Sequence, residues 1–111
     1  MSLHGIATGI PQTERIILST TTPTVLLQAS QNGNFIHSVY IAEATGTATD
    51  IVLDVYDGTT TFQLSGARTI GANGSLWLQI DQYLAFGSAL RGTASAANRL
   101  HVHTTHSLPT N

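Results

Sequence analysis

The sequence predicts an all-β protein: a single antiparallel β-sandwich, jelly-roll or immunoglobulin-like, with an extended N-terminal arm. Three observations predict this fold. The 111 residues suffice for one domain and leave no room for a second core. Short runs rich in Val, Ile, Leu, Thr and aromatic residues follow one another between turn residues. No window of eleven residues shows the apolar stripe of an amphipathic helix.

The chain divides into three segments. Residues 1–13 contain two glycines and a proline without a clear hydrophobic period, which indicates an extended arm. Residues 14–106 form the predicted sandwich domain, and residues 107–111 form a C-terminal tail. Nine strands are expected in the sandwich, over residues 14–19, 24–29, 34–43, 48–57, 60–65, 67–70, 74–80, 88–94 and 98–106.

Turn chemistry supports the boundaries between these strands. Asp57-Gly58 lies between two apolar runs and is a strong hairpin signal, because Gly tolerates a positive φ. Asn73-Gly74 has the same character before the run 75–80, and Asn32-Gly33-Asn34 connects two further strands.

Alternation along the strands assigns their faces. Ile51, Leu53 and Val55 are expected to share one face of their strand. Two sets are expected to point into the core: Leu76, Leu78 and Ile80; and Leu100 with Val102. Trp77, His101 and His103 then point outward. The run 35–42 is apolar on both faces, with Phe35, Val39 and Ile41 on one of them. Such a strand is either central and sandwiched, or its outer face meets another subunit.

Composition limits the possible partners. Only 9% of the residues are charged, against about 25% in ordinary soluble domains, whereas 41% are hydrophobic. Removing a charge from water is costly, so surfaces that become covered are poor in charge. We therefore expect other subunits to cover much of this surface. The alternative is an ordinary Thr-rich β-domain of low charge.

Several partner classes are excluded on the same basis. The four basic residues are scattered, which argues against a nucleic-acid partner: Arg15, Arg68, Arg91 and Arg99. Apolar runs of four residues or fewer argue against a membrane span, and the N-terminus lacks the pattern of a secretory signal. The absence of cysteine excludes disulfides and cysteine-based zinc sites.

No catalytic motif stands out. The sequence has no Gly-x-Ser-x-Gly elbow, no phosphate-binding glycine loop and no His-Glu-x-x-His helix. Asp50 and Asp54 share a strand face, but about 13 Å separates them, too far for a glycosidase pair. We therefore expect a protein that is not an enzyme and needs no cofactor.

The histidines give one metal hypothesis. His101 and His103 lie at i and i+2 of a strand, so both imidazoles project to the same side. Two ligands are too few, but a symmetric trimer could bring three such pairs to its axis. The alternative is a solvated or interfacial histidine pair. His37 is expected to be partly buried and hydrogen-bonded.

An outward tryptophan is the better functional signal. Trp77 is expected to be an interface anchor, because a Trp desolvates a large area with few rotors frozen. Two other interpretations stay open: a sugar-stacking site, and coverage by the arm of the same chain. The residues expected to extend such an interface are Tyr40, Tyr56, Arg91, Ile6 and Ile10.

The residues from Thr24 to Thr104 resemble small β-sandwich proteins encoded in the structural gene clusters of tailed bacteriophages. The resemblance rests on the order of four segments: Ser38–Ile41, Val55–Thr61, Ile70–Leu78 and Leu90–Val102. It implies a virion structural protein, assembled in the host cytoplasm. The first expectation is a capsid decoration (cement) protein; the alternatives are a neck, tail or baseplate component, or a glycan-binding adsorption module. The implied partners are the major capsid protein or other virion subunits, and copies of the chain itself, with a trimer favoured.

Overall fold

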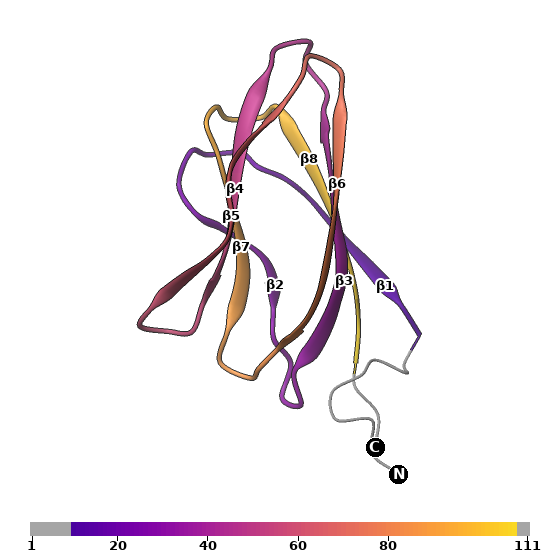
Figure 1. Cartoon of the computed structure of the whole chain (residues 1–111), viewed down its shortest axis with the longest axis vertical. Coiled ribbons are helices and arrows are strands. Elements are labelled where there is room, and N and C mark those ends of the chain that lie inside the picture. The colour runs from indigo at the N-terminus through magenta and orange to yellow at the C-terminus, as the bar shows by residue number, and fades with distance from the viewer. Residues whose placement is uncertain (1–9, 109–111) are drawn as a thin grey trace.

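The computed structural model describes residues 10–108, which fold into two antiparallel four-stranded sheets packed face to face (Figure 1). This confirms the all-β sandwich. The strands are β1 (Gln12–Ile17), β2 (Thr24–Gln28), β3 (Asn34–Glu43), β4 (Thr49–Tyr56), β5 (Thr61–Ile70), β6 (Ser75–Leu84), β7 (Ala89–Ala94) and β8 (Leu100–Ser107). No helix in residues 10–108 is long and apolar enough to cross a membrane.

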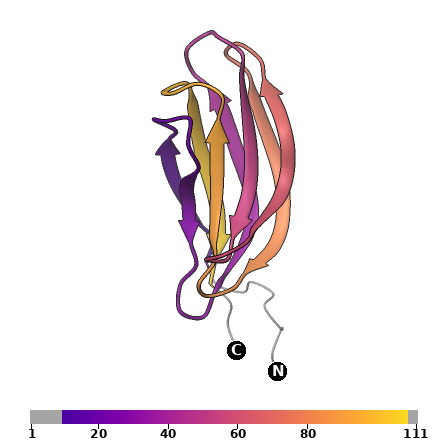
Figure 2. The same ribbon diagram turned by 90° about the vertical axis from the view of Figure 1, so that its left-hand side faces the viewer.

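The strand order identifies the sandwich as a jelly roll. The first sheet has the order β1-β8-β3-β6 and the second has the order β2-β7-β4-β5. Each strand of the first half of the chain thus pairs with one strand of the second half, in reverse order: β1 with β8, β2 with β7, β3 with β6 and β4 with β5. An antiparallel ribbon folded over on itself gives this double Greek-key arrangement, which differs from the immunoglobulin order. Figure 2, turned by 90°, shows the strands running roughly parallel to the long axis of the molecule.

The core lies between the sheets. Ile41 and Val102 from the first sheet and Ile51 and Leu53 from the second have no exposed side-chain surface. The faces expected for β4, β6 and β8 are confirmed, since their inward residues belong to this cluster or pack against it.

Two strand assignments were wrong. The segments 60–65 and 67–70 form one strand, β5, and the segment 74–80 continues to Leu84 as β6. The break expected between residues 65 and 67 does not end β5. The strand instead shifts its register opposite Ile51, Leu53 and Asp54 of β4. In β6 an extra residue opposite β3 coincides with Asp81, which has a φ of 52°. Such bulges kink a strand without ending it.

The face expected for Phe35 was also wrong. The register of β3 shifts between Ile36 and Ser38 against both neighbouring strands. A bulge inverts the alternation, so the buried apolar residues of β3 are Ile36, Val39 and Ile41. Phe35 lies on the other face, where its ring is 5.0 Å from that of His37.

The segment boundaries differ slightly from the expected ones. β1 begins at Gln12, so two residues of the expected arm belong to the sandwich, and β8 ends at Ser107. Most of the arm (residues 1–9) and residues 109–111 lie outside the described part of the chain.

The Asp57-Gly58 hairpin has the predicted chemistry. Gly58 adopts a φ of 101°, and Asp57 Oδ1 accepts hydrogen bonds from the N–H groups of Thr60 at 2.7 Å and Thr59 at 3.0 Å. These two backbone bonds hold the pKa of Asp57 below its usual value of 3.8. Asn73, at the second predicted turn, adopts a φ of 56°.

Candidate interaction surface

A row of four side chains crosses the outer face of the first sheet. Strand register places Arg15 of β1 opposite His103 of β8, His103 opposite Tyr40 of β3, and Tyr40 opposite Trp77 of β6. We call these four residues the cross-sheet row. The rings of Tyr40 and His103 meet edge to face, with 5.7 Å between their centroids. Trp77 is 57% exposed and Tyr40 is 40% exposed, so the row leaves aromatic area uncovered on this face.

The rows on either side of the cross-sheet row carry no formal charge. They consist of Thr13, Thr105, Ser38 and Gln79 on one side, and of Ile17, His101, Ala42 and Ser75 on the other. Across these three rows Arg15 is the one residue with a fixed charge. A partner could therefore cover this face with little cost from desolvated charges.

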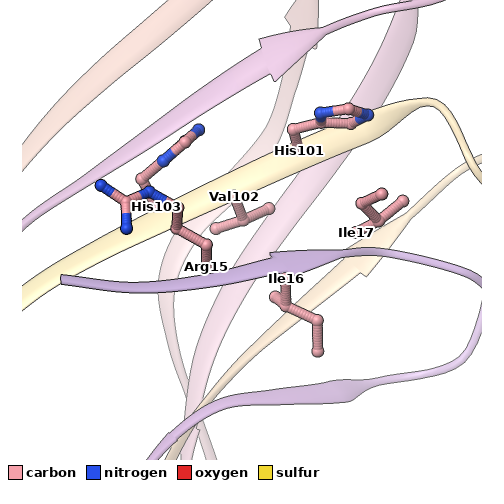
Figure 3. Close-up of a pocket in the computed structure, with 6 residues that line it drawn as sticks. All are labelled: Arg15, Ile16, Ile17, His101, Val102 and His103. Carbon is pink, nitrogen blue, oxygen red and sulfur yellow. The ribbon is translucent and has the colours of Figure 1, made fainter.

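A hollow of about 180 Å³ opens on this face between β1 and β8. Its lining residues are Arg15, Ile16, Ile17, His101, Val102 and His103. Figure 3 shows Arg15 reaching from β1 toward His103 on β8, with Ile17 and His101 at the other end of the hollow. Ile16 and Val102 point to the opposite side of the two strands, so the floor of the hollow is their backbone.

Tyr56 and Arg91 lie on the outer face of the second sheet, away from Trp77 and Tyr40. The four residues therefore do not form one patch. Arg91 is held within the chain: its Nε donates to Asp54 Oδ1 at 2.7 Å, and its guanidinium carbon lies 4.5 Å from the centre of the Tyr56 ring. An arginine with these contacts has little capacity left for a partner.

The histidine pair has no third His, Cys, Asp or Glu ligand in the part of the chain that the structure describes. In residues 10–108 no group of three or more His, Cys, Asp or Glu side chains could hold a metal ion. The guanidinium of Arg15, directly across from His103, adds a positive charge where a cation would bind. A shared metal site for His101 and His103 at a trimer axis stays a prediction.

The remaining expected positions divide as follows. His37 is half-buried, and its Nε2 lies 2.8 Å from the Ser107 hydroxyl, in agreement with the expected hydrogen-bonded side chain. Ile10 is 85% exposed, and its interface role stays a prediction. Ile6 lies outside the described residues.

Sequence reasoning missed a polar cluster at one end of the sandwich. His106 is 5% exposed; its Nδ1 lies 3.2 Å from Asn34 Nδ2, and its Nε2 lies 3.2 Å from Glu14 Oε2. Asn34 Oδ1 in turn accepts from the Ser30 N–H at 2.7 Å. The alternation that put His101 and His103 outside could have placed His106 inside, because it falls on the opposite parity.

Sequence reasoning also missed the role of Glu43. Its side chain is only 2% exposed, at the end of β3. Oε1 accepts from the N–H groups of Gly46, Thr47 and Asn73, and Oε2 accepts from Thr45. One carboxylate thus organises two loops. No sequence signal marks it, since Glu is ordinarily exposed.

Comparison with protein-family models gives no match for this chain, and comparison with curated protein sequences gives none either. Solved structures share the fold. A chain from the acid-stable capsid of Helicobacter pylori bacteriophage KHP30 matches with a TM-score of 0.60 and 12% identity, over 95% of this chain and 92% of that one. A chain from the capsid asymmetric unit of cyanophage Pam1 matches with a TM-score of 0.51 and 18% identity, over 96% and 89%.

The fold is not confined to phage capsids. A chain from Bacillus endospore appendages, which form disulfide-linked pili, matches with a TM-score of 0.58 and 14% identity, over 99% of this chain and 96% of that one. At these identities the likeness shows the fold alone: a β-sandwich of the kind found in phage capsids.

Proposed function

We propose that this chain is a non-enzymatic structural protein of a bacteriophage virion that decorates the assembled capsid shell. The observation that carries the proposal is the outer face of the first sheet, which combines exposed Trp77 and Tyr40 with uncharged rows on either side. Exposed aromatic residues in a surface poor in charge are typical of interface cores. The shared fold with chains from two phage capsids supports the virion setting.

The mechanism follows from mass action. A protein that binds the assembled shell and not its dissociated subunits stabilises the shell by its free energy of binding. In this proposal the first sheet lies against the major capsid protein or against another copy of the chain, with a trimer as the favoured homo-oligomer. The predicted arm, including Ile6 and Ile10, adds contacts to a neighbouring subunit.

The spore-appendage fold neighbour suggests a different assembly, which the composition disfavours. Pili of that family are disulfide-linked. The present sequence contains no cysteine, so its subunits cannot be joined in that way.

The proposal is tested by thermal release of DNA from phage particles with and without the protein. We expect bound protein to raise the release temperature and Trp77→Ala to reduce that gain by weakening binding about tenfold or more. The matched control is Phe62→Ala, which removes an aromatic ring of similar exposure, 54%, from the second sheet. Identical release curves with and without wild-type protein would rule out the decoration role.

Copy number separates the remaining virion positions. Hundreds of copies per particle indicate a shell component, whereas six or twelve copies indicate a ring in the neck, tail or baseplate. A glycan array measures the adsorption alternative: binding that is lost with Trp77→Ala would favour a sugar-stacking site over a protein interface.

A further inference from the structure

The hollow between β1 and β8 contains the positive charge of Arg15, and any protein that covers this face must compensate that charge. Arg15 makes no ion pair with any residue between 10 and 108; the salt bridge between permanently charged side chains found there joins Arg91 to Asp54. If a partner covered this face without an opposing group, it would bury an unpaired guanidinium, which is strongly unfavourable.

The geometry favours one type of opposing group. Arg15 and His103 form one cross-strand pair, and Ile17 and His101 form the next. Cross-strand neighbours on one face lie about 5 Å apart, and His101 and His103 are separated by about 7 Å along β8. Arg15, His101 and His103 are thus three of the residues that line the hollow of about 180 Å³, and the Arg15 guanidinium lies at the His103 end (Figure 3). Guanidinium donors match a carboxylate geometrically, and a neutral imidazole still supplies one N–H.

We propose that the hollow bounded by Arg15, His101 and His103 binds a carboxylate side chain, an Asp or Glu, of the subunit that covers the outer face of the first sheet. This rests on the proposed function in that a covering subunit must exist. Trp77 and Tyr40 then supply the apolar part of the contact, and the hollow fixes the register of the partner. This assignment replaces a metal ion at the histidine pair with an anion, in keeping with the charge of Arg15.

The site itself is tested without any particle. The probe is N-acetyl-aspartate N-methylamide, and the uncharged control is N-acetyl-asparagine N-methylamide. We expect the probe to shift the imidazole NMR signals of His101 and His103 saturably and the control to leave them unchanged. Arg15→Gln should weaken binding of the probe at least about tenfold. The inference is overturned if the signals do not move, move equally with the control, or move unchanged in Arg15→Gln.

Binding to particles tests the role of the site in assembly. Arg15→Gln should weaken binding about tenfold or more, whereas Arg68→Gln, which removes an exposed arginine from β5 of the second sheet, should change it less than about twofold. If wild-type protein binds and both variants match it, the carboxylate contact is wrong and the decoration role stands. If wild-type protein does not bind to particles, the decoration role fails. The NMR titration then decides by itself whether the hollow binds a carboxylate.

Discussion

Glu43 illustrates how a single carboxylate can hold two loops together. Burial raises its pKa, but the hydroxyl of Thr45 and the backbone N–H groups of Asn73, Thr45 and Gly46 outweigh burial and lower it from 4.5 to about 2. The ionised form is therefore the one that the folded loops stabilise. The loops 44–47 and 71–74 thus depend on this one charge.

The low pKa of Glu43 predicts a specific loss of stability in acid. A carboxyl group whose pKa is about 2 when folded and 4.5 when unfolded stabilises the fold above pH 4.5, and this contribution disappears as the pH falls toward 2. Glu43→Gln should lower stability at pH 7 by presenting an amide donor to N–H groups, and should remove this part of the acid dependence.

Urea denaturation at pH 7, 5, 3 and 2 checks this prediction. The control is Asp81→Asn, which changes an exposed acid whose positive φ an Asn tolerates. Equal midpoints for Glu43→Gln and wild type at pH 7 would show that the carboxylate does not hold the loops.

Single residues also mark what the sequence could and could not predict about the candidate site. The outward positions of Trp77, His101 and His103 followed from alternation alone. The grouping of Trp77 with Arg91 failed because the two lie on different sheets, and sheet membership is set by pairing between distant strands. For the same reason the sequence could not predict that Arg15 lies opposite His103, because the two residues are 88 positions apart along the chain.

At the level of strands, the turn between β2 and β3 depends on a close approach. Gly33 has a φ of 81°, and a Cβ at this position would overlap the hydroxyl oxygen and two ring carbons of Tyr83 on β6. The Tyr83 hydroxyl donates to the Asn32 carbonyl at 2.6 Å, which ties the turn to β6. Glycine is thus required twice, for its backbone conformation and for the space.

Gly33→Ala should therefore destabilise the protein by about 2–5 kcal/mol, the sum of left-handed strain and displacement of Tyr83. Gly87→Ala is the matched control, because Gly87 has a φ of 91° and nothing lies within 4 Å of its Cβ position. The control should cost only about 1–2 kcal/mol of strain. Thermal or urea denaturation measures both, and equal losses would show that Tyr83 yields without cost.

Strand boundaries were predictable where turn residues mark them, as at Asp57-Gly58, and the sandwich itself followed from alternation. The bulges were not predictable. An extra residue in β3 or β6 carries no fixed sequence signature, yet it reverses which residues face the core. That is why Val39 and Ile41 were assigned correctly to one face while Phe35 was not.

For the whole molecule, the jelly-roll order makes most pairing non-local. β1 pairs with β8, and Glu14 meets His106 across 92 positions. Closing such long loops costs entropy before the contacts that offset it can form. The choice between jelly roll and immunoglobulin order is made at this range, so local sequence pattern left both open.

This topology predicts slow folding for so small a domain. Refolding from urea should take milliseconds to seconds, as in other β-sandwiches, and stopped-flow fluorescence of Trp77 is the measurement. Because Trp77 is exposed, circular dichroism serves as a second probe of the same transition. Complete refolding within microseconds would contradict the prediction.

The bulges have a consequence for how copies of this chain can polymerise. Three of the four edge strands in the described part of the chain, β2, β5 and β6, contain register shifts against their neighbours, and β1 does not. An edge strand with a bulge is a poor template for the addition of another strand. Such irregular edges protect β-proteins from fibril growth. Open-ended aggregation through the edge strands β2, β5 and β6 is thereby discouraged. Among the edge strands of the described part of the chain, only the six-residue β1 is regular enough to pair with a strand of another molecule.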